Sequence, residues 1–303
     1  MKKVTIFGVG NIGARVAFFL ARSRDVARIR LVDVDPERSR ATLLDFMQSN
    51  VALQSKIAFA SYDEPKEIDQ SDVVLVAAGV EGRASPDVSL PSERDRRTME
   101  DIAAQIGHFA PQAVVAVLSQ PAEIFCSIIA RSGYFTPSKV IGFPLLIYRE
   151  WFRDRIARAV GLSNEDVRIT TVRTLRGEEL VLDQCTVGGI PVTDVVANTA
   201  RLMELPSDEE MARRLRYHHY APAAVISEVT GEIVSKRRQV ITMVCAEPDS
   251  GAFIESKAVI GPQGAERTVE LALTGEQTAR HDEYRERVIG LTNGLTNRSG
   301  AIR

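Results

Sequence analysis

The sequence predicts an α/β fold in which a doubly wound parallel sheet is followed by an α+β unit. Short apolar runs of strand length alternate with helix-like segments through the first half of the chain. The runs at residues 73–78 and 113–118 contain no polar residue, which is typical of strands covered on both faces of a parallel sheet. Beyond about residue 150 the helices become longer and the strands carry polar alternation. We therefore expect two domains, residues 1–143 and residues 144–303.

The first domain is expected to alternate strands and helices. A helix start is indicated at Asp35-Pro36, because aspartate can cap a first turn and proline fits its geometry. In chain order, the expected elements are a strand at 4–7, a helix at 11–22, a strand at 29–32, a helix from 35 to about 47, strands at 73–78 and 113–118 with a helix at 97–109 between them, a helix at 121–131 and a strand at 140–142.

The second domain is expected to mix helices and strands. The expected elements are helices at 151–160, 195–204 and 209–234, strands at 181–187, 240–246 and 258–260, and a charged helix at 275–289. The tail from Asn293 is rich in Asn, Gly and Arg, so we expect it to fray.

The composition is that of an ordinary globular protein. The 303 residues are 45% hydrophobic, and 38 basic against 40 acidic side chains leave a net charge of −2. The chain has no basic surplus for a phosphate backbone, and its longest apolar run, residues 73–80, is too short to span a bilayer. Neither a nucleic acid nor a membrane is an expected partner. The three cysteines form no CxxC pair, so we expect a cytoplasmic protein without a disulfide framework or a metal site.

A glycine-rich segment, Gly8-Val9-Gly10-Asn11-Ile12-Gly13, joins the first expected strand to the first expected helix. In a G-x-G-x-x-G motif the first glycine permits a tight turn, the second lets the backbone approach a pyrophosphate and the third lets helix and strand pack closely. Asp33 follows Gly13 by twenty residues, at the end of the second expected strand. Its carboxylate would accept the ribose hydroxyls of NAD and repel the 2′-phosphate of NADP. A generic glycine turn capped by Asp33 is the alternative, but the combined pattern predicts a Rossmann-type NAD-binding domain. No arginine stands directly beside Asp33 in the sequence, but Arg38 and Arg40 lie a turn or so further on and could complicate the preference for NAD.

Further segments resemble the lactate/malate dehydrogenase family, in that family's order. They are residues 71–80, 109–111, 140–142, 187–191, 220–223 and 260–264. Each piece is short, and their collinearity over residues 2–290 carries the resemblance. The resemblance implies an NAD-dependent oxidoreductase that assembles as a homodimer or homotetramer.

The resemblance also implies a catalytic set that this chain keeps only in part. The family uses a histidine as acid/base, an aspartate that orients it, an asparagine that helps to hold the substrate and an arginine that grips the substrate carboxylate. Arg149 falls on that carboxylate anchor, and Gln120 falls on the asparagine position. Leu146 falls on the aspartate position and Arg176 on the histidine position. Since arginine stays protonated at neutral pH and leucine cannot orient a base, we expect negligible oxidation of malate or lactate.

Other residues could supply the missing functions. The family's mobile-loop arginine falls among Arg83, Arg94, Arg96 and Arg97, of which we select Arg94. Proton chemistry could move to His218 or His219, of which at most one can face a pocket if both lie on a helix, and we select His218. The expected catalytic residues are thus Arg94, Arg149, Arg176 and His218. The expected cofactor contacts are Gly8, Gly10, Asn11, Ile12, Gly13, Asp33, Ala78, Gly79 and Gln120.

Three functions remain open at this point. The first is an NAD-dependent oxidoreductase acting on an unidentified anionic hydroxy or oxo acid, since Arg149, Arg176 and a loop arginine would place two or three positive charges around one site. The second is a catalytically silent NAD(H)-binding protein. The third borrows from the related NAD-dependent glycosidases, which hold a metal through Cys and His, but Cys126 does not fall on that metal position. We favour the first.

Overall fold

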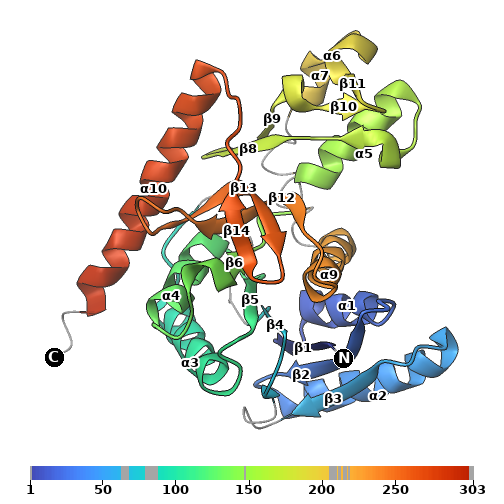
Figure 1. The fold of residues 1–303 in the computed structure, drawn as a ribbon, viewed down its shortest axis with the longest axis vertical. Helices are drawn as coiled ribbons and strands as arrows, with labels where there is room; N and C mark the ends of the chain where they lie inside the picture. The colour runs from blue at the N-terminus through green and yellow to red at the C-terminus, as the bar shows by residue number, and fades with distance from the viewer. Residues whose placement is uncertain are drawn as a thin grey trace.

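The computed structural model describes residues 2–62, 68–78, 88–146, 148–204, 210, 213, 217 and 219–299, with the backbone alone for Tyr62 and residues 296–299 (Figure 1). Its centre is a nine-stranded sheet with the order β14-β13-β12-β6-β5-β4-β1-β2-β3. In that order the strands are Gly264–Thr268, Phe253–Gly261, Gln239–Ala246, Val140–Gly142, Val114–Val117, Val73–Val76, Lys2–Phe7, Val26–Val32 and Ala58–Tyr62.

Six neighbouring strands, β6 through β3 in the sheet order, run parallel, which confirms the expected α/β fold. Strands β12, β13 and β14 come from the second half of the chain and add to the same sheet in antiparallel pairs. The sheet is therefore continuous across residue 143, the boundary that we expect between the two domains. Strand β3 was not expected from the sequence, because this edge strand is only partly buried and its apolar run, residues 57–60, is short and half alanine.

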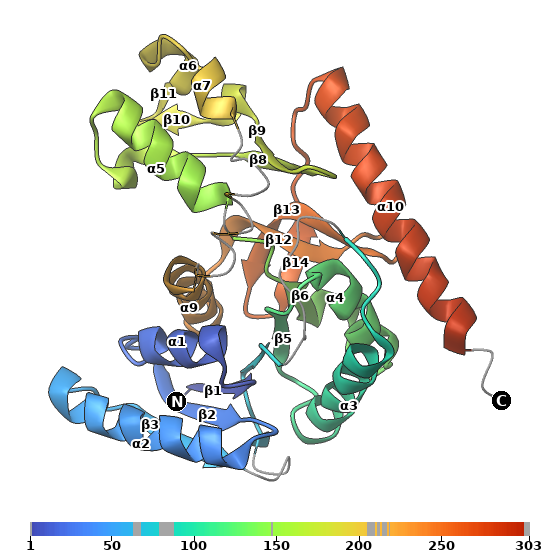
Figure 2. The ribbon, with the colours of Figure 1, turned by 180° about the vertical axis from the view of Figure 1, so that it is seen from behind.

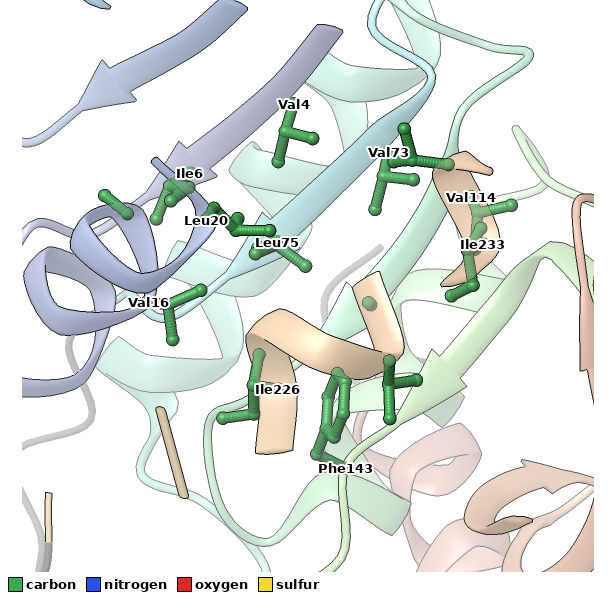
Figure 3. Close-up of a cluster of buried hydrophobic side chains, with 14 of the residues drawn as sticks. Val4, Ile6, Val16, Leu20, Val73, Leu75, Val114, Phe143, Ile226 and Ile233 are labelled. Atoms are coloured by element: carbon green, nitrogen blue, oxygen red, sulfur yellow. The ribbon is translucent and has the colours of Figure 1, made fainter. Parts of the chain in front are cut away.

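Helices cover both faces of the parallel strands. On one face lie α1 (Asn11–Leu20) and α9 (Tyr220–Val234), whose Val16, Leu20 and Ile226 pack with Val4 and Leu75 of the sheet (Figure 3). On the other face lie α3 (Glu93–Phe109) and α4 (Ala122–Arg131), which pack with the alternate residues of the same strands. This two-sided burial explains why β4 and β5 read as uninterrupted apolar runs.

A smaller group of elements lies beyond the carboxyl end of β6 (Figures 1 and 2). It consists of α5 (Tyr148–Val160), β7 (Val167–Arg168), β8 (Thr171–Thr174), β9 (Gly177–Leu180), β10 (Thr186–Val187), β11 (Ile190–Pro191), α6 (Val192–Val195) and α7 (Ala200–Met203). The hairpin of β8 and β9 turns at Leu175-Arg176 and packs along the closing helix α10 (Gly275–Ser299).

Three local predictions in the second half are wrong. The expected strand at 181–187 is a 3-10 turn, Leu182–Gln184, followed by the two-residue β10. The expected helix at 195–204 is split into α6 and α7, because the intervening Val-Ala-Asn-Thr segment contains poor helix formers. The tail expected to fray from Asn293 instead continues as helix to Ser299, since Leu295 packs into the core.

Of the long helix expected at 209–234, α9 accounts for the part from Tyr220, and much of the segment before it lies outside the described residues. Pro222 lies in the first turn of α9, where its missing N–H removes no intrahelical hydrogen bond. Within the described part of the chain, no helix combines the length and apolarity that crossing a membrane requires.

Candidate cofactor and substrate site

The glycine loop follows β1 at the carboxyl edge of the parallel strands. Gly8 has φ 91°, and a Cβ there would stand 2.5 Å from the carbonyl oxygen of Ala77. A Cβ on Gly13 would stand 1.9 Å from the carbonyl oxygen of Gly8. Neither position has room for a side chain, so both glycines are required by the packing of β1, α1 and β4.

Gly10 differs from these two glycines. A Cβ built on it would meet no atom within 4 Å, so its outer side is open. Gly10 also precedes the first turn of α1, and no side chain caps that helix. The first backbone N–H groups of α1 are thus available to an anion. This arrangement fits the pyrophosphate of a dinucleotide, which Gly10, Asn11 and Ile12 would hold.

Asp33 connects the end of β2 to the glycine loop. Its Oδ2 accepts the N–H of Val9 at 2.7 Å and its Oδ1 accepts the N–H of Asp35 at 3.0 Å. Each carboxylate oxygen can accept a further hydrogen bond, so the ribose hydroxyls of NAD remain possible partners. Of the two arginines a turn further on, Arg38 does approach this carboxylate: it lies in the first turn of α2 (Pro36–Leu53), and its Nη1 is within 3.6 Å of Asp33 Oδ1.

The neighbouring edge of the sheet carries two more predicted cofactor contacts. The Ala78 carbonyl accepts the Ser119 hydroxyl at 3.0 Å, which joins the ends of β4 and β5. Gln120 precedes the cis peptide bond to Pro121, and its Nε2 donates to the carbonyl of Phe143 at 2.9 Å. Gln120 therefore ties this loop to the end of β6. The predicted contact at Gly79 lies outside the described residues.

The predicted catalytic residues occupy different environments. Arg176 is exposed at the tip of the β8–β9 hairpin, and its side chain makes no ion pair with any residue that the structure describes. Arg94 is exposed in the first turn of α3. Leu146 is 5% exposed and belongs to the apolar core. His218 lies outside the described residues, whereas its neighbour His219 is half-buried directly before α9.

Arg149, the predicted carboxylate anchor, lies in the first turn of α5. Its Nη1 is buried and has no hydrogen-bond partner among the described residues. Its charge lowers the pKa of Glu178 and of Glu255, so it lies close to both carboxyls. Burial has the larger effect and raises the pKa of both groups above the ordinary value. Arg149 thus faces two buried glutamates, which were not expected from the sequence.

These glutamates belong to a buried polar network. Glu178 lies opposite Arg173 in the hairpin, and Arg173 Nε lies 3.6 Å from Glu255 Oε2. Tyr284 of α10 donates its hydroxyl to Glu123 Oε1 at 2.9 Å and accepts the N–H of Glu255 at 3.1 Å. The network joins the hairpin that carries Arg176 to α4, β13 and α10. A glutamate within the apolar strand around residue 255 was the one sequence signal available.

Tyr148 is a further residue that the sequence did not single out. It is 2% exposed, and a Cβ on Gly177 would stand 2.8 Å from its hydroxyl oxygen. Tyr148 therefore packs against the backbone directly after Arg176. Neither glutamate that follows Arg176 in the hairpin pairs with it: Glu178 lies opposite Arg173, and Glu179 pairs with Arg280 at 2.8 Å.

The described residues hold no group of three or more His, Cys, Asp or Glu side chains arranged to bind a metal ion. The three cysteines are free and buried. Cys126 lies on the buried face of α4, where burial raises the pKa of its thiol well above the ordinary value. Such a thiol is a poor metal ligand at neutral pH.

A glycine loop at the carboxyl edge of a parallel sheet, followed by an uncapped helix and an acidic residue after the second strand, defines a dinucleotide-binding α/β protein. Residues 2–142 match the family model for the NAD-binding domain of lactate/malate dehydrogenase. Residues 2–142 therefore belong to the NAD-binding domain family of lactate/malate dehydrogenase, and the cofactor is NAD.

Malate and lactate dehydrogenases are similar to this chain over nearly its whole length. A malate dehydrogenase from Rhodopirellula baltica is 28% identical over 291 residues, which cover 91% of each chain. A malate dehydrogenase from Desulforudis audaxviator is 26% identical over 309 residues and covers 97% of this chain and 98% of the relative. The solved malate dehydrogenase of Cryptosporidium parvum superposes with a TM-score of 0.84 at 20% identity, covering 98% of this chain and 99% of that one. The lactate dehydrogenase of the same organism, solved with lactic acid and NAD, gives 0.83 at 21% identity and covers 98% of each chain.

Proposed function

We propose that this protein is an NAD-dependent oxidoreductase for a small anionic hydroxy or oxo acid, and that malate and lactate are poor substrates. The curated relatives reported above are named malate dehydrogenases. Our proposal departs from their names because of one observation. The residues that fall on the family's acid/base pair are an exposed arginine, Arg176, and a leucine inside the apolar core, Leu146.

That observation carries the proposal for a chemical reason. Oxidation of a hydroxyl to a carbonyl needs a group that takes the hydroxyl proton, and arginine stays protonated at neutral pH. A positioned acid/base contributes about 10²–10⁴-fold to the rate, so its loss alone makes ordinary malate or lactate turnover very slow. A substrate of this enzyme must use another proton acceptor, for which we propose His218.

We propose the following roles for NAD and for the other predicted site residues. NAD, when bound, supplies the hydride acceptor. Gly10, Asn11 and Ile12 hold its pyrophosphate at the start of α1, and Asp33 accepts its ribose hydroxyls. Arg149 and Arg176 bind the acid groups of the substrate, with Arg94 entering from α3. By resemblance to the family, we also propose a cytoplasmic homodimer or homotetramer, which light scattering after size-exclusion chromatography would test.

The experiment is a spectrophotometric screen of hydroxy and oxo acids with NAD(H), including malate, lactate and acids with a second anionic group. We expect measurable NADH formation with a dianionic acid other than malate, and none above background with malate or lactate. The Arg149→Ala variant should lose that activity. If no acid is oxidised or reduced, the oxidoreductase proposal fails.

A catalytically silent NAD(H)-binding protein is the second candidate, and one observation favours it. Arg149 lies near the buried carboxyls of Glu178 and Glu255, so the protein itself offers groups that could balance its charge without a ligand. In that case NADH should bind with unchanged affinity in the Arg149→Ala variant, and no acid should alter the melting temperature of the NADH complex. Stabilisation by a dianion that the Arg149→Ala change abolishes would exclude this alternative.

A further inference from the structure

A hollow of about 560 Å³ lies at the amino edge of the parallel sheet, opposite to the glycine loop. Its walls come from the starts of β1 and β4, the loop between α3 and β5, the end of α9 and the turn between β13 and β14. Since the glycine loop follows the carboxyl end of β1, the hollow and the cofactor site lie at opposite edges of one sheet. A volume of this size is typical of sites for small metabolites.

Lysines gather at this hollow although the chain contains few of them. The sequence has seven lysines and thirty-one arginines. Three of the seven, Lys2, Lys139 and Lys236, line the hollow. A fourth, Lys3, lies beside it and donates its Nζ to Gln70 Oε1 at 3.2 Å. In a chain that otherwise uses arginine for positive charge, this concentration of ammonium groups calls for an explanation.

The positive charge of the hollow is only partly compensated. Asp72 is the one acidic residue in its lining, and its Oδ1 accepts the Nζ of Lys2 at 2.7 Å. Lys139 donates its Nζ to the carbonyl and the Oε1 of Gln112 at 2.8 and 3.0 Å, both neutral acceptors. The ammonium of Lys236 has no partner in the described part of the chain. Three lysines against one aspartate leave a net charge of +2 on the lining.

The backbone conformation of two lining residues is unusual. Two of the three non-glycine residues with positive φ in the described chain, Gln70 at 55° and Lys236 at 59°, line this hollow. Lys236 follows the last turn of α9, and its N–H donates to the carbonyl of Ile233 at 3.1 Å. Glycine is the usual residue at such a helix end, because it adopts this conformation without strain. The chain instead places a lysine there, and this lysine lines the hollow.

The rest of the lining is partly apolar and includes Phe109, Pro111, Val234 and Pro262. We propose that this hollow is a second ligand site, independent of the proposed reaction, for a small organic phosphate with an apolar body. A phosphate monoester carries about −1.5 to −2 charge at neutral pH, which matches the lining. Lys139 and Lys236 bind the phosphate, as lysine does in many phosphate sites, and the apolar wall contacts the body.

Isothermal titration with phenyl phosphate tests the site, in the presence of saturating NADH so that the glycine loop is already occupied. Inorganic phosphate and phenol serve as the two half-ligands. We expect phenyl phosphate to bind at least tenfold more tightly than inorganic phosphate, and phenol to give no measurable binding. The Lys139→Met and Lys236→Met variants should each weaken phenyl phosphate at least tenfold. Lys56→Met removes one exposed lysine elsewhere and should change nothing.

Three results would overturn the proposal. The first is no binding of phenyl phosphate to the NADH complex, which would assign any binding seen without NADH to the glycine loop. The second is equal affinity for phenyl phosphate and inorganic phosphate, which would leave the apolar wall without a role. The third is equal weakening by Lys56→Met, which would show a general charge effect. Unchanged NADH affinity and melting temperature in the variants establish that each variant is folded.

Discussion

The two sides of the expected active site differ in what they require of the sequence. On the cofactor side, Gly8 and Gly13 have no room for a Cβ, so geometry dictates the residues. On the substrate side, Arg176 is exposed at the tip of the β8–β9 hairpin, and its side chain makes no ion pair with a described residue. The fold tolerates a change at position 176 because the hairpin is held by the buried Arg173 and its neighbours and not by the side chain at its tip. Dinucleotide binding and turnover can therefore be separated within one fold.

The largest expected loss in the free energy of unfolding comes from breaking the buried network that holds the hairpin. Replacing Arg173 by Met leaves the carboxyls of Glu255 and Glu178 without their buried counter-charge, and breaking a buried pair in this way costs about 3–5 kcal/mol. Urea denaturation should show this loss in the free energy of unfolding. The double change Arg173→Met with Glu255→Leu should recover part of it, since no unpaired charge then remains at position 255. An unchanged midpoint for Arg173→Met would show that the network does not support the hairpin.

On the cofactor side, Gly13→Ala should lower the stability of the protein, whereas Gly10→Ala should lower its affinity for NADH. Alanine at 13 must push against the Gly8 carbonyl oxygen, and overpacking of this kind costs about 1–3 kcal/mol of stability. Alanine at 10 meets no protein atom, so the melting temperature should stay the same while NADH affinity falls at least tenfold. Thermal unfolding and NADH fluorescence titration measure both. Equal NADH affinity for the Gly10→Ala variant and the parent would place the pyrophosphate elsewhere.

The buried glutamates predict a pH dependence of stability. The pKa of Glu178 is raised above 4.5 in the folded protein, so between pH 4.5 and that raised pKa the folded state binds more protons than the unfolded state. The free energy of unfolding therefore falls as pH rises through this window, by at most about 1.4 kcal/mol per pH unit for one group. Glu178→Gln should flatten the fall, whereas Glu179→Gln, on the neighbouring residue, should not. Parallel stability profiles for the Glu178→Gln variant and the parent would contradict the assignment.

The smallest expected change in free energy concerns the preference for NADH over NADPH. Asp33→Ala removes both a ribose acceptor and the charge that repels a 2′-phosphate, and it frees Arg38 from its ion pair. We expect the preference for NADH over NADPH to narrow about tenfold, which equals about 1.4 kcal/mol. Calorimetric titration with both cofactors measures the ratio. Equal or tighter binding of NADPH by the parent would contradict the role given to Asp33.

The comparison also explains which features could be predicted from sequence. Strands β4 and β5 and the glycine loop were predictable, because each depends on a local pattern of apolar residues or glycines. The hairpin of β8 and β9 was not, since its strands contain buried charged residues and no continuous apolar run. The contact between Glu255 and Arg173 joins segments that are far apart in the chain, so no local pattern reports it. Arg38 lies beside Asp33 because of the direction in which α2 starts. The number of residues between Asp33 and Arg38 does not by itself determine that direction.

We expect this protein to bind NADH while lacking the proton transfer that the family's catalytic residues provide. The most direct test is single-turnover stopped-flow mixing of the NADH complex with oxaloacetate or pyruvate, followed by NADH absorbance and fluorescence in one preparation. We expect NADH fluorescence to report stoichiometric binding and its absorbance to stay constant after either acid is added. A rapid loss of absorbance with oxaloacetate or pyruvate would contradict the account and show that Leu146 and Arg176 do not stand in the positions assigned to them.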